Sequence, residues 1–242
     1  GRIKIWDEES FLGGCPTSPQ IIETSAHGFC QFSLCRNFGG SGNLLVTPSE
    51  RSNETSLWDL NDTIKPQLNF SVKPSATNLM CCRFFQPISA PFPAILSGFD
   101  DGRVALFDLR KNAPLIVRKL HDSPLMGLDV NLTEMKGVSC SSGKNLHLWN
   151  ISLEEAKIEV FKTLEMPREG ASFVESRKDG KIFVVGAWDG TVRVYRWKKP
   201  LKLANLSFSE DLVNCISFNP DESRGEFAIG SRDSKVYVWQ VY

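Results

Sequence analysis

The stretch Ile182–Trp197, IFVVGAWDGTVRVYRW, carries the pattern from which the rest of the chain can be interpreted. Its first six residues form an apolar run rich in valine and isoleucine, as expected for a strand buried on both faces. At the following turn, Gly190 can take a positive φ without steric cost, and the Asp189 carboxylate can accept hydrogen bonds from free backbone amides. Beyond the turn, two valines alternate with larger polar or aromatic residues in a period of two. An Asp-Gly pair between two such runs predicts a β-hairpin.

The hairpin recurs along the chain. Further copies are Leu44–Leu60, Ile95–Leu109, Val138–Ile151 and Phe227–Val241, and the chain opens with half a copy, Gly1–Asp7. Each copy carries an aromatic residue at one shared position, which we call the aromatic slot. The slot residues are separated by 42 to 52 positions, and they are Trp6, Trp58, Phe107, Trp149, Tyr195 and Trp239. We predict that they occupy equivalent places on third strands and pack between neighbouring sheets.

Repeats of this length, each closing on an apolar-apolar-Trp-Asp-like strand, resemble the WD40 blades of a β-propeller. The resemblance spans essentially the whole chain and implies an all-β fold, with residues 1–242 as a single propeller domain that is seven-bladed when complete. Since the sequence begins and ends on a third strand, we expect an N-terminally truncated arc of about five to six blades, with the first blade or blades missing. The exposed strand edges of an open arc would favour aggregation.

WD40 blades often hold a buried polar network, in which a histidine before the first strand contacts the hairpin aspartate, a strand Ser or Thr, and the Trp. Here His27 and His121 fall in blades whose hairpins lack the aspartate. The hairpins with Asp101, Asp189 and Asp233 belong to blades without that histidine. We therefore expect a divergent propeller in which these networks are largely missing and packing carries more of the stability.

Composition narrows the classes of partner. The chain has 28 basic and 28 acidic residues and no formal net charge, so it lacks the long-range field expected of a nucleic-acid binder or of a surface that grips anionic membranes. No apolar run approaches the roughly 20 residues of a membrane span, and no signal peptide opens the sequence. Seven cysteines are an odd number, which favours reduced core thiols in a cytoplasmic or nuclear protein.

The sequence offers little for catalysis. Its three histidines, His27, His121 and His147, fall at blade entries or inside a strand, where structural roles are expected. The cysteines lack zinc-site spacing, and no phosphate-loop, dinucleotide-binding or hydrolase motif is present. Asp100 and Asp101 are explained by turn capping. We therefore expect no enzymatic activity, cofactor, metal or small-molecule substrate; a propeller hydrolase, which ranks last, would need titratable groups converging on the central channel.

The C-terminal half further resembles the guanine-nucleotide-binding-protein β-subunit-like protein 1 family, whose fungal counterpart is ASTRA-associated protein 1. The stretches that carry this resemblance are 96–104, 121–129, 186–190, 192–197 and 228–239. The resemblance implies a seven-bladed, non-enzymatic scaffold. It also implies an adaptor role in maturation of the phosphatidylinositol-3-kinase-related kinases, together with the TTT co-chaperone complex.

A second scaffold function remains open. Phe107-Asp108-Leu109-Arg110 resembles the WDxR box by which some propellers dock on the DDB-type adaptor of cullin-4 ubiquitin ligases, with Phe107 in place of Trp. Arg110 could present a rigid fork of donors to an acceptor on the partner. Asp108 and Arg110 are therefore candidate partner-binding residues, although Asp-Leu-Arg after a third strand is also common in this fold for structural reasons.

Overall fold

The structure is a computed structural model that describes residues 2–6, 18–24, 32–38, 42–49, 51–61, 65–73, 77–87, 92–111 and 113–241. Across these ranges the chain is built from β-strands, with one short 3-10 helix at Glu222–Arg224. Every pair of neighbouring strands is antiparallel. None of the helical residues described here forms a helix long and apolar enough to cross a membrane.

A two-stranded sheet comes first, followed by five larger sheets that we call the first to fifth blades. The two-stranded sheet pairs β1 (Arg2–Ile5) with β2 (Gln20–Glu23). The first blade contains β3 (Ser33–Phe38), β4 (Gly42–Pro48), β5 (Glu54–Asp59) and β6 (Leu68–Ser71). The second blade contains β7 (Leu79–Phe85), β8 (Ala94–Phe99), β9 (Arg103–Asp108) and β10 (Pro114–Lys119).

The remaining blades repeat this order. The third contains β11 (Leu125–Asn131), β12 (Lys136–Ser141), β13 (Asn145–Ser152) and β14 (Lys157–Glu165). The fourth contains β15 (Ala171–Ser176), β16 (Ile182–Ala187), β17 (Thr191–Arg196) and β18 (Leu201–Ser207). The fifth contains β19 (Val213–Phe218), β20 (Glu226–Ser231) and β21 (Val236–Gln240).

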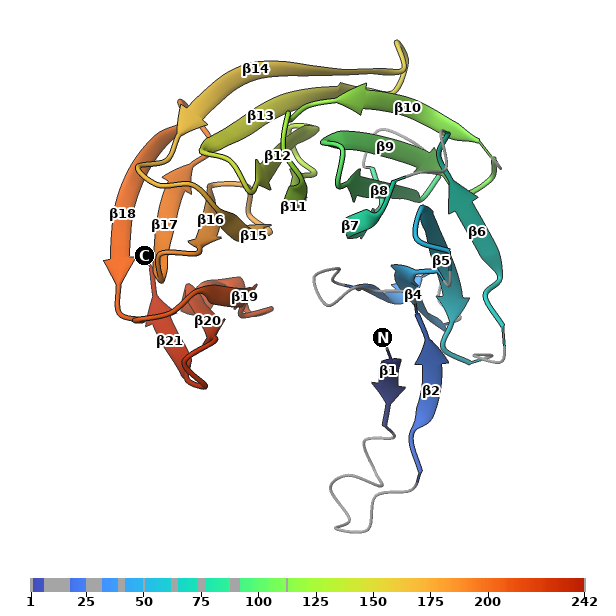
Figure 1. The fold of residues 1–242 in the computed structure, drawn as a ribbon, viewed down its shortest axis with the longest axis horizontal. Helices are drawn as coiled ribbons and strands as arrows, with labels where there is room; N and C mark the ends of the chain where they lie inside the picture. The colour runs from blue at the N-terminus through green and yellow to red at the C-terminus, as the bar shows by residue number, and fades with distance from the viewer. Residues whose placement is uncertain are drawn as a thin grey trace.

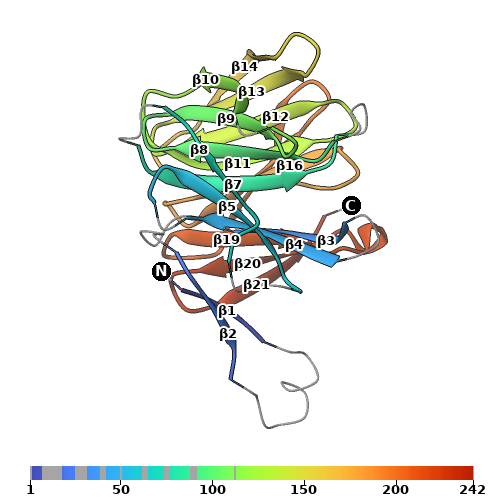
Figure 2. The same ribbon diagram turned by 90° about the vertical axis from the view of Figure 1, so that its right-hand side faces the viewer.

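The blades follow one another around an arc, with each first strand towards the centre and each fourth strand at the periphery (Figure 1). The arc is open between the fifth blade and the β1–β2 sheet, and the side view shows this small sheet extending away from the blades (Figure 2). This is a five-bladed propeller arrangement, which confirms the expected fold class. A seven-bladed ring for the complete protein stays a prediction.

The stretch Ile182–Trp197 forms the predicted hairpin. β16 is buried along its whole length, as its apolar run predicts, and Gly190 has a φ of 75° at the turn. The turn at Asp233 and Ser234 reaches the same region without glycine, since Ser234 has a φ of 65°. The hairpin aspartates cap their own turns: Asp189 Oδ1 accepts a hydrogen bond from the Thr191 amide at 3.2 Å.

Five of the six aromatic slot residues occupy equivalent positions. Each lies three residue pairs away from the last paired residues next to the hairpin turn, and the pairs are Trp58–Leu45, Phe107–Ile95, Trp149–Gly137, Tyr195–Phe183 and Trp239–Phe227. Trp6 lies one residue beyond β1, whose described partner is β2, so the same register does not apply to it.

The prediction that every slot residue packs between sheets is confirmed for four slots and wrong for two. Phe107, Trp149 and Tyr195 are buried in clusters that join adjacent blades, and Trp58 is buried in a cluster that joins the first blade to the β1–β2 sheet. Trp239 and Trp6 are 36% and 44% exposed. An aromatic side chain is buried only where a neighbouring sheet covers it, and none of the described sheets covers these two. On the same uncovered blade, Val236 and Val238 of β21 are also largely exposed.

Two stretches of the described chain show where strands end. β3 runs to Phe38 and β4 begins at Gly42. Ile151 and Ser152 continue β13, where the Ile151 amide donates to the Met135 carbonyl at 2.9 Å, and Ala156 takes a positive φ of 50° in the turn that follows.

Candidate functional site

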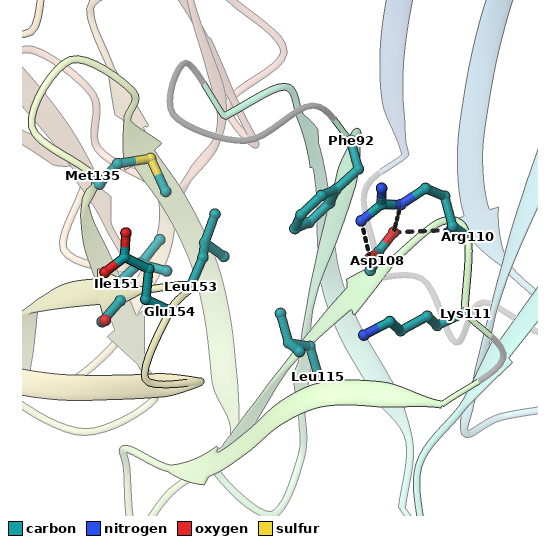
Figure 3. Close-up of a pocket in the computed structure, with 10 residues that line it drawn as sticks. Phe92, Asp108, Arg110, Lys111, Leu115, Met135, Ile151, Leu153 and Glu154 are labelled. Carbon is teal, nitrogen blue, oxygen red and sulfur yellow. Dashed lines mark hydrogen bonds and ion pairs between the residues drawn. The ribbon is translucent and has the colours of Figure 1, made fainter.

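The two residues singled out from the sequence, Asp108 and Arg110, lie in a pocket of about 500 Å³ between the second and third blades. We call it the Arg110 pocket, and Figure 3 shows its two walls. The second blade contributes one wall, made of Phe92, Asp108, Arg110, Lys111 and Leu115. The third blade contributes the facing wall, made of Met135, Ile151, Ser152, Leu153 and Glu154.

Asp108 is the last residue of β9, and its buried carboxylate is held by Arg110. The guanidinium donates Nε to Oδ1 at 3.0 Å and Nη2 to Oδ2 at 2.8 Å, and the Arg110 amide adds a third bond to Oδ1 at 3.0 Å. Hydrogen bonding from the Arg110 side chain lowers the pKa of Asp108, against the opposing effect of burial. The guanidinium carbon also lies 4.3 Å from the centre of the Phe92 ring.

This geometry bears on the proposed ligase dock. Two of the Arg110 donor groups are already committed to Asp108, and one face of the guanidinium stacks on Phe92. The side chain is still 55% exposed, so part of the fork faces solvent. Whether Asp108 and Arg110 bind a partner stays a prediction, but the contacts give both residues a structural role within the second blade.

The buried polar network of WD40 blades, which we expected to be largely missing, is partly present in the third blade. His121 Nε2 lies 2.8 Å from Ser139 Oγ, and the Trp149 indole Nε1 donates to the same oxygen at 3.1 Å. The hairpin aspartate is absent, as predicted, but the other three members do meet. His27, the other blade-entry histidine, lies outside the described residues.

The His121–Ser139 pair resembles a nucleophile and its base in distance only. Both side chains are buried, His121 being 3% exposed and Ser139 fully enclosed, so no substrate can reach the hydroxyl. Burial lowers the pKa of His121 to about 3, with a further lowering from the His147 ring 4.4 Å away. His121 is therefore a neutral, buried residue with a structural role in the third blade.

The inner strands carry charged residues that the sequence analysis did not identify. Arg83, Asp129 and Glu175 are each the fifth residue of the first strand of their blade, and Ser217 has this place in the fifth blade. Arg83 Nε lies 2.8 Å from Asp129 Oδ1, which joins the second and third blades. The sequence alone could have shown that charged residues recur at the fifth position of the first strands. The ion pair between Arg83 and Asp129, however, depends on how the two blades lie side by side.

Glu175 is the unusual member of this series. Its Oε2 is buried and has no hydrogen-bond partner among the described residues. Burial raises the pKa of Glu175 to about 7, while Arg83 lowers it and Asp129 raises it further. The carboxylate is therefore harder to ionise in the folded protein than in the unfolded chain, where a glutamate has a pKa of about 4.3.

This shift predicts a pH-dependent stability. The folded state binds more protons than the unfolded state between about pH 4.3 and pH 7, so the Glu175 contribution falls as pH rises through that window. Glu175→Gln should remove the penalty, making the variant more stable than the wild type at pH 8 by about 3–4 kcal/mol. At pH 4, where Glu175 is mostly protonated in both states, the two proteins should have similar stability. Urea denaturation of both proteins from pH 4 to pH 8 measures the difference between their free energies of unfolding. Because His121 is present in both proteins, its own effect on the pH dependence cancels in this difference.

Other candidate chemistry is also accounted for by the fold. No group of three or more His, Cys, Asp and Glu side chains in the described ranges could hold a metal ion. Asp100, considered with Asp101 for turn capping, accepts from the Asn78 amide at 3.0 Å and from the Asn78 side chain at 2.6 Å. None of the described cysteines forms a disulfide: Cys81, Cys82 and Cys140 are buried and Cys35 is half-buried, whereas Cys215 is exposed, contrary to the core position expected of the thiols.

Radial four-stranded antiparallel sheets, each with an aromatic slot on its third strand and a hairpin between the second and third, define a WD40 β-propeller. In agreement, residues 163–196 and 202–240 match the family model described as "WD domain, G-beta repeat". Over its whole length the chain is 30% identical to guanine nucleotide-binding protein subunit beta-like protein 1 from Mus musculus, and it spans 72% of that protein. The chain belongs to the guanine nucleotide-binding protein subunit beta-like protein 1 family.

Other relatives match in part. ASTRA-associated protein 1 from Schizosaccharomyces japonicus is 27% identical over 128 residues, which are 53% of this chain and 34% of that protein. U3 small nucleolar RNA-associated protein 15 from Saccharomyces cerevisiae is 22% identical across 93% of this chain and 41% of its own length. The chain therefore spans less than half of each of these two fungal relatives.

Proposed function

We propose that this protein is a non-enzymatic scaffold that acts as an adaptor in co-chaperone-assisted maturation of the phosphatidylinositol-3-kinase-related kinases. The observation that carries the proposal is similarity over the entire chain to the mouse β-like protein 1, at 30% identity. The partial similarity to ASTRA-associated protein 1 supports it, because that protein is named for its association with ASTRA. The partners would be proteins, with the TTT co-chaperone complex and the kinases as the first candidates.

Physical features of the chain agree with a protein-binding role. The formal net charge of zero provides no general attraction for nucleic acid or anionic membranes. The five described cysteines form no disulfide, which fits a reducing compartment, and we propose that the protein acts in the cytoplasm, the nucleus or both. Propeller specificity lies in loops and surface side chains, so the repeat itself does not select the partner.

The alternative role, a substrate receptor of a cullin-4 ligase that docks through Asp108-Leu109-Arg110, can be separated from the adaptor role with Arg110. Tagged full-length protein and its Arg110→Ala variant would be purified from cells, and the TTT subunits, the kinases and the cullin-4 adaptor quantified by mass spectrometry. We expect the co-chaperone and the kinases at equal yield with both proteins. Capture of the cullin-4 adaptor by the wild type, lost in the variant, would favour the alternative.

The structure shows which control this experiment needs. Arg110→Ala leaves the buried Asp108 carboxylate without its guanidinium, so a loss of binding could reflect a weakened second blade. The double variant Asp108→Asn/Arg110→Gln removes both charges together and leaves no buried carboxylate unpaired. If both variants keep the wild-type circular dichroism spectrum yet lose the co-chaperone, Arg110 would belong to the adaptor surface and our assignment of it would be wrong.

A further inference from the structure

The Arg110 pocket has walls that are already fixed without a bound partner. On the second blade, Arg110 is clamped between Asp108 and Phe92, and the Lys111 amide bonds the Asp108 carbonyl at 2.9 Å. On the third blade, the Met135 carbonyl accepts the Ile151 amide at 2.9 Å. A site that needs little ordering on binding loses less conformational entropy, which favours recognition of a short ligand.

The floor of the pocket is apolar and lies between two blades. Leu115 comes from β10, and Met135 and Leu153 come from the turns on either side of the β12–β13 hairpin. All three are partly buried and pack against the core cluster that joins these blades. A volume of about 500 Å³ is within the range of roughly 300–1,000 Å³ for ligand pockets and exceeds the needs of one aliphatic side chain.

Two charges of opposite sign lie on opposite walls. Lys111 is on the second-blade wall and Glu154 on the third-blade wall (Figure 3). Neither forms an ion pair with any residue that the structure describes, whereas the charge of Arg110 is balanced by Asp108. The pocket therefore presents one unpaired cation and one unpaired anion across an apolar floor.

We propose that the Arg110 pocket binds a short extended peptide segment of a partner protein, with a large aliphatic side chain flanked by one acidic and one basic residue. The aliphatic side chain packs on Leu115, Met135 and Leu153, the acidic residue lies next to Lys111, and the basic residue lies next to Glu154. Alternate residues of an extended chain face the same side, so the charged residues belong two positions before and after the aliphatic one. The inference rests on the scaffold role in the proposed function, and not on which complex the protein joins.

Blocked heptapeptides test this directly. The probe is GESLSKG, compared with GESLSEG, GKSLSKG and GESSSKG, which carry the wrong charge at one end or lack the leucine. The readout is the ¹³C-methyl NMR signal of Met135, one of four methionines in the chain, assigned with a Met135→Leu variant. We expect GESLSKG to shift this signal and leave the other three in place. Peptides with two like charges should bind about five-fold more weakly, as expected for one lost ion pair at an exposed site.

Charge-reversed protein variants provide the matched test. Lys111→Glu should reverse the preference towards GKSLSKG, and Glu154→Lys should reverse it towards GESLSEG. Leu115→Gln should weaken all the peptides, with the signals of Met80, Met126 and Met166 reporting that the fold is kept. Equal affinity for the three leucine peptides, or no shift of Met135 with any of them, would overturn the proposal. Neither result would touch the proposed function, because that is tested by co-purification from cells.

Discussion

Trp149→Ala should lower the free energy of unfolding by about 3–5 kcal/mol, the usual cost of removing a large buried aromatic side chain. Trp149 is fully enclosed and packs in a cluster that includes Val104 and Leu106 of the neighbouring blade. Its indole also donates to Ser139, so the variant removes one hydrogen bond from the buried His121 network. Urea denaturation followed by tryptophan fluorescence and circular dichroism measures the change.

Trp239→Ala is the matched control. Trp239 occupies the same register position in the fifth blade but is 36% exposed, and its described ring contact, at 5.6 Å between centroids, is with Phe208. We expect a loss of about 1 kcal/mol, because less apolar area leaves water on folding. Equal losses for the two variants would mean that the slot contributes through its strand position, and not through packing between blades.

Gly137→Ala should be the second severe substitution, with a loss of about 3 kcal/mol from overpacking. Gly137 is the strand partner of Trp149 and lies under its ring, so an added Cβ would overlap the ring atoms Cη2 and Cζ3. The equivalent residues under the other slots are Leu45, Ile95, Phe183 and Phe227, which shows that the strand position itself accepts side chains. The requirement for glycine comes from the Trp149 ring orientation.

A double-mutant cycle separates this clash from a general intolerance of β12. In a Trp149→Leu background, where the overlapping ring atoms are gone, Gly137→Ala should cost less than about 1 kcal/mol. The coupling measured by urea denaturation should therefore be at least about 2 kcal/mol. Additive effects would show that Gly137 is needed for the backbone of β12 and not for the ring above it.

The repeated β-hairpins are the part of the fold that the local sequence determines. Alternation with a period of two, Asp-Gly turns and a repeat length near 45 residues depend on near neighbours in the chain, so β16 and its hairpin could be predicted from Ile182–Trp197 alone. The equivalence of Trp149 and Tyr195 follows from the same local spacing, and the register confirms it. The family resemblance could likewise be recognised from short motifs, and whole-chain similarity to the mouse protein supports it.

The properties that depend on a neighbouring blade could not be predicted in this way. Trp149 and Trp239 have the same place in the repeat, and only the sheet packed against Trp149 makes one buried and the other exposed. The contact between Arg83 and Asp129 joins residues 46 positions apart through the placement of two blades.

At the candidate site, the sequence by itself determined that Asp108 and Arg110 follow a third strand and suit a role in protein binding. Only the tertiary structure decided that Arg110 folds back on Asp108 and Phe92, and that Lys111 and Glu154 lie on opposite walls of one pocket. The physical reason is range. Turns and the alternation of side chains along a strand depend on residues that are close in the chain. Burial, ion pairing and pocket shape depend on side chains that meet only after the blades have packed.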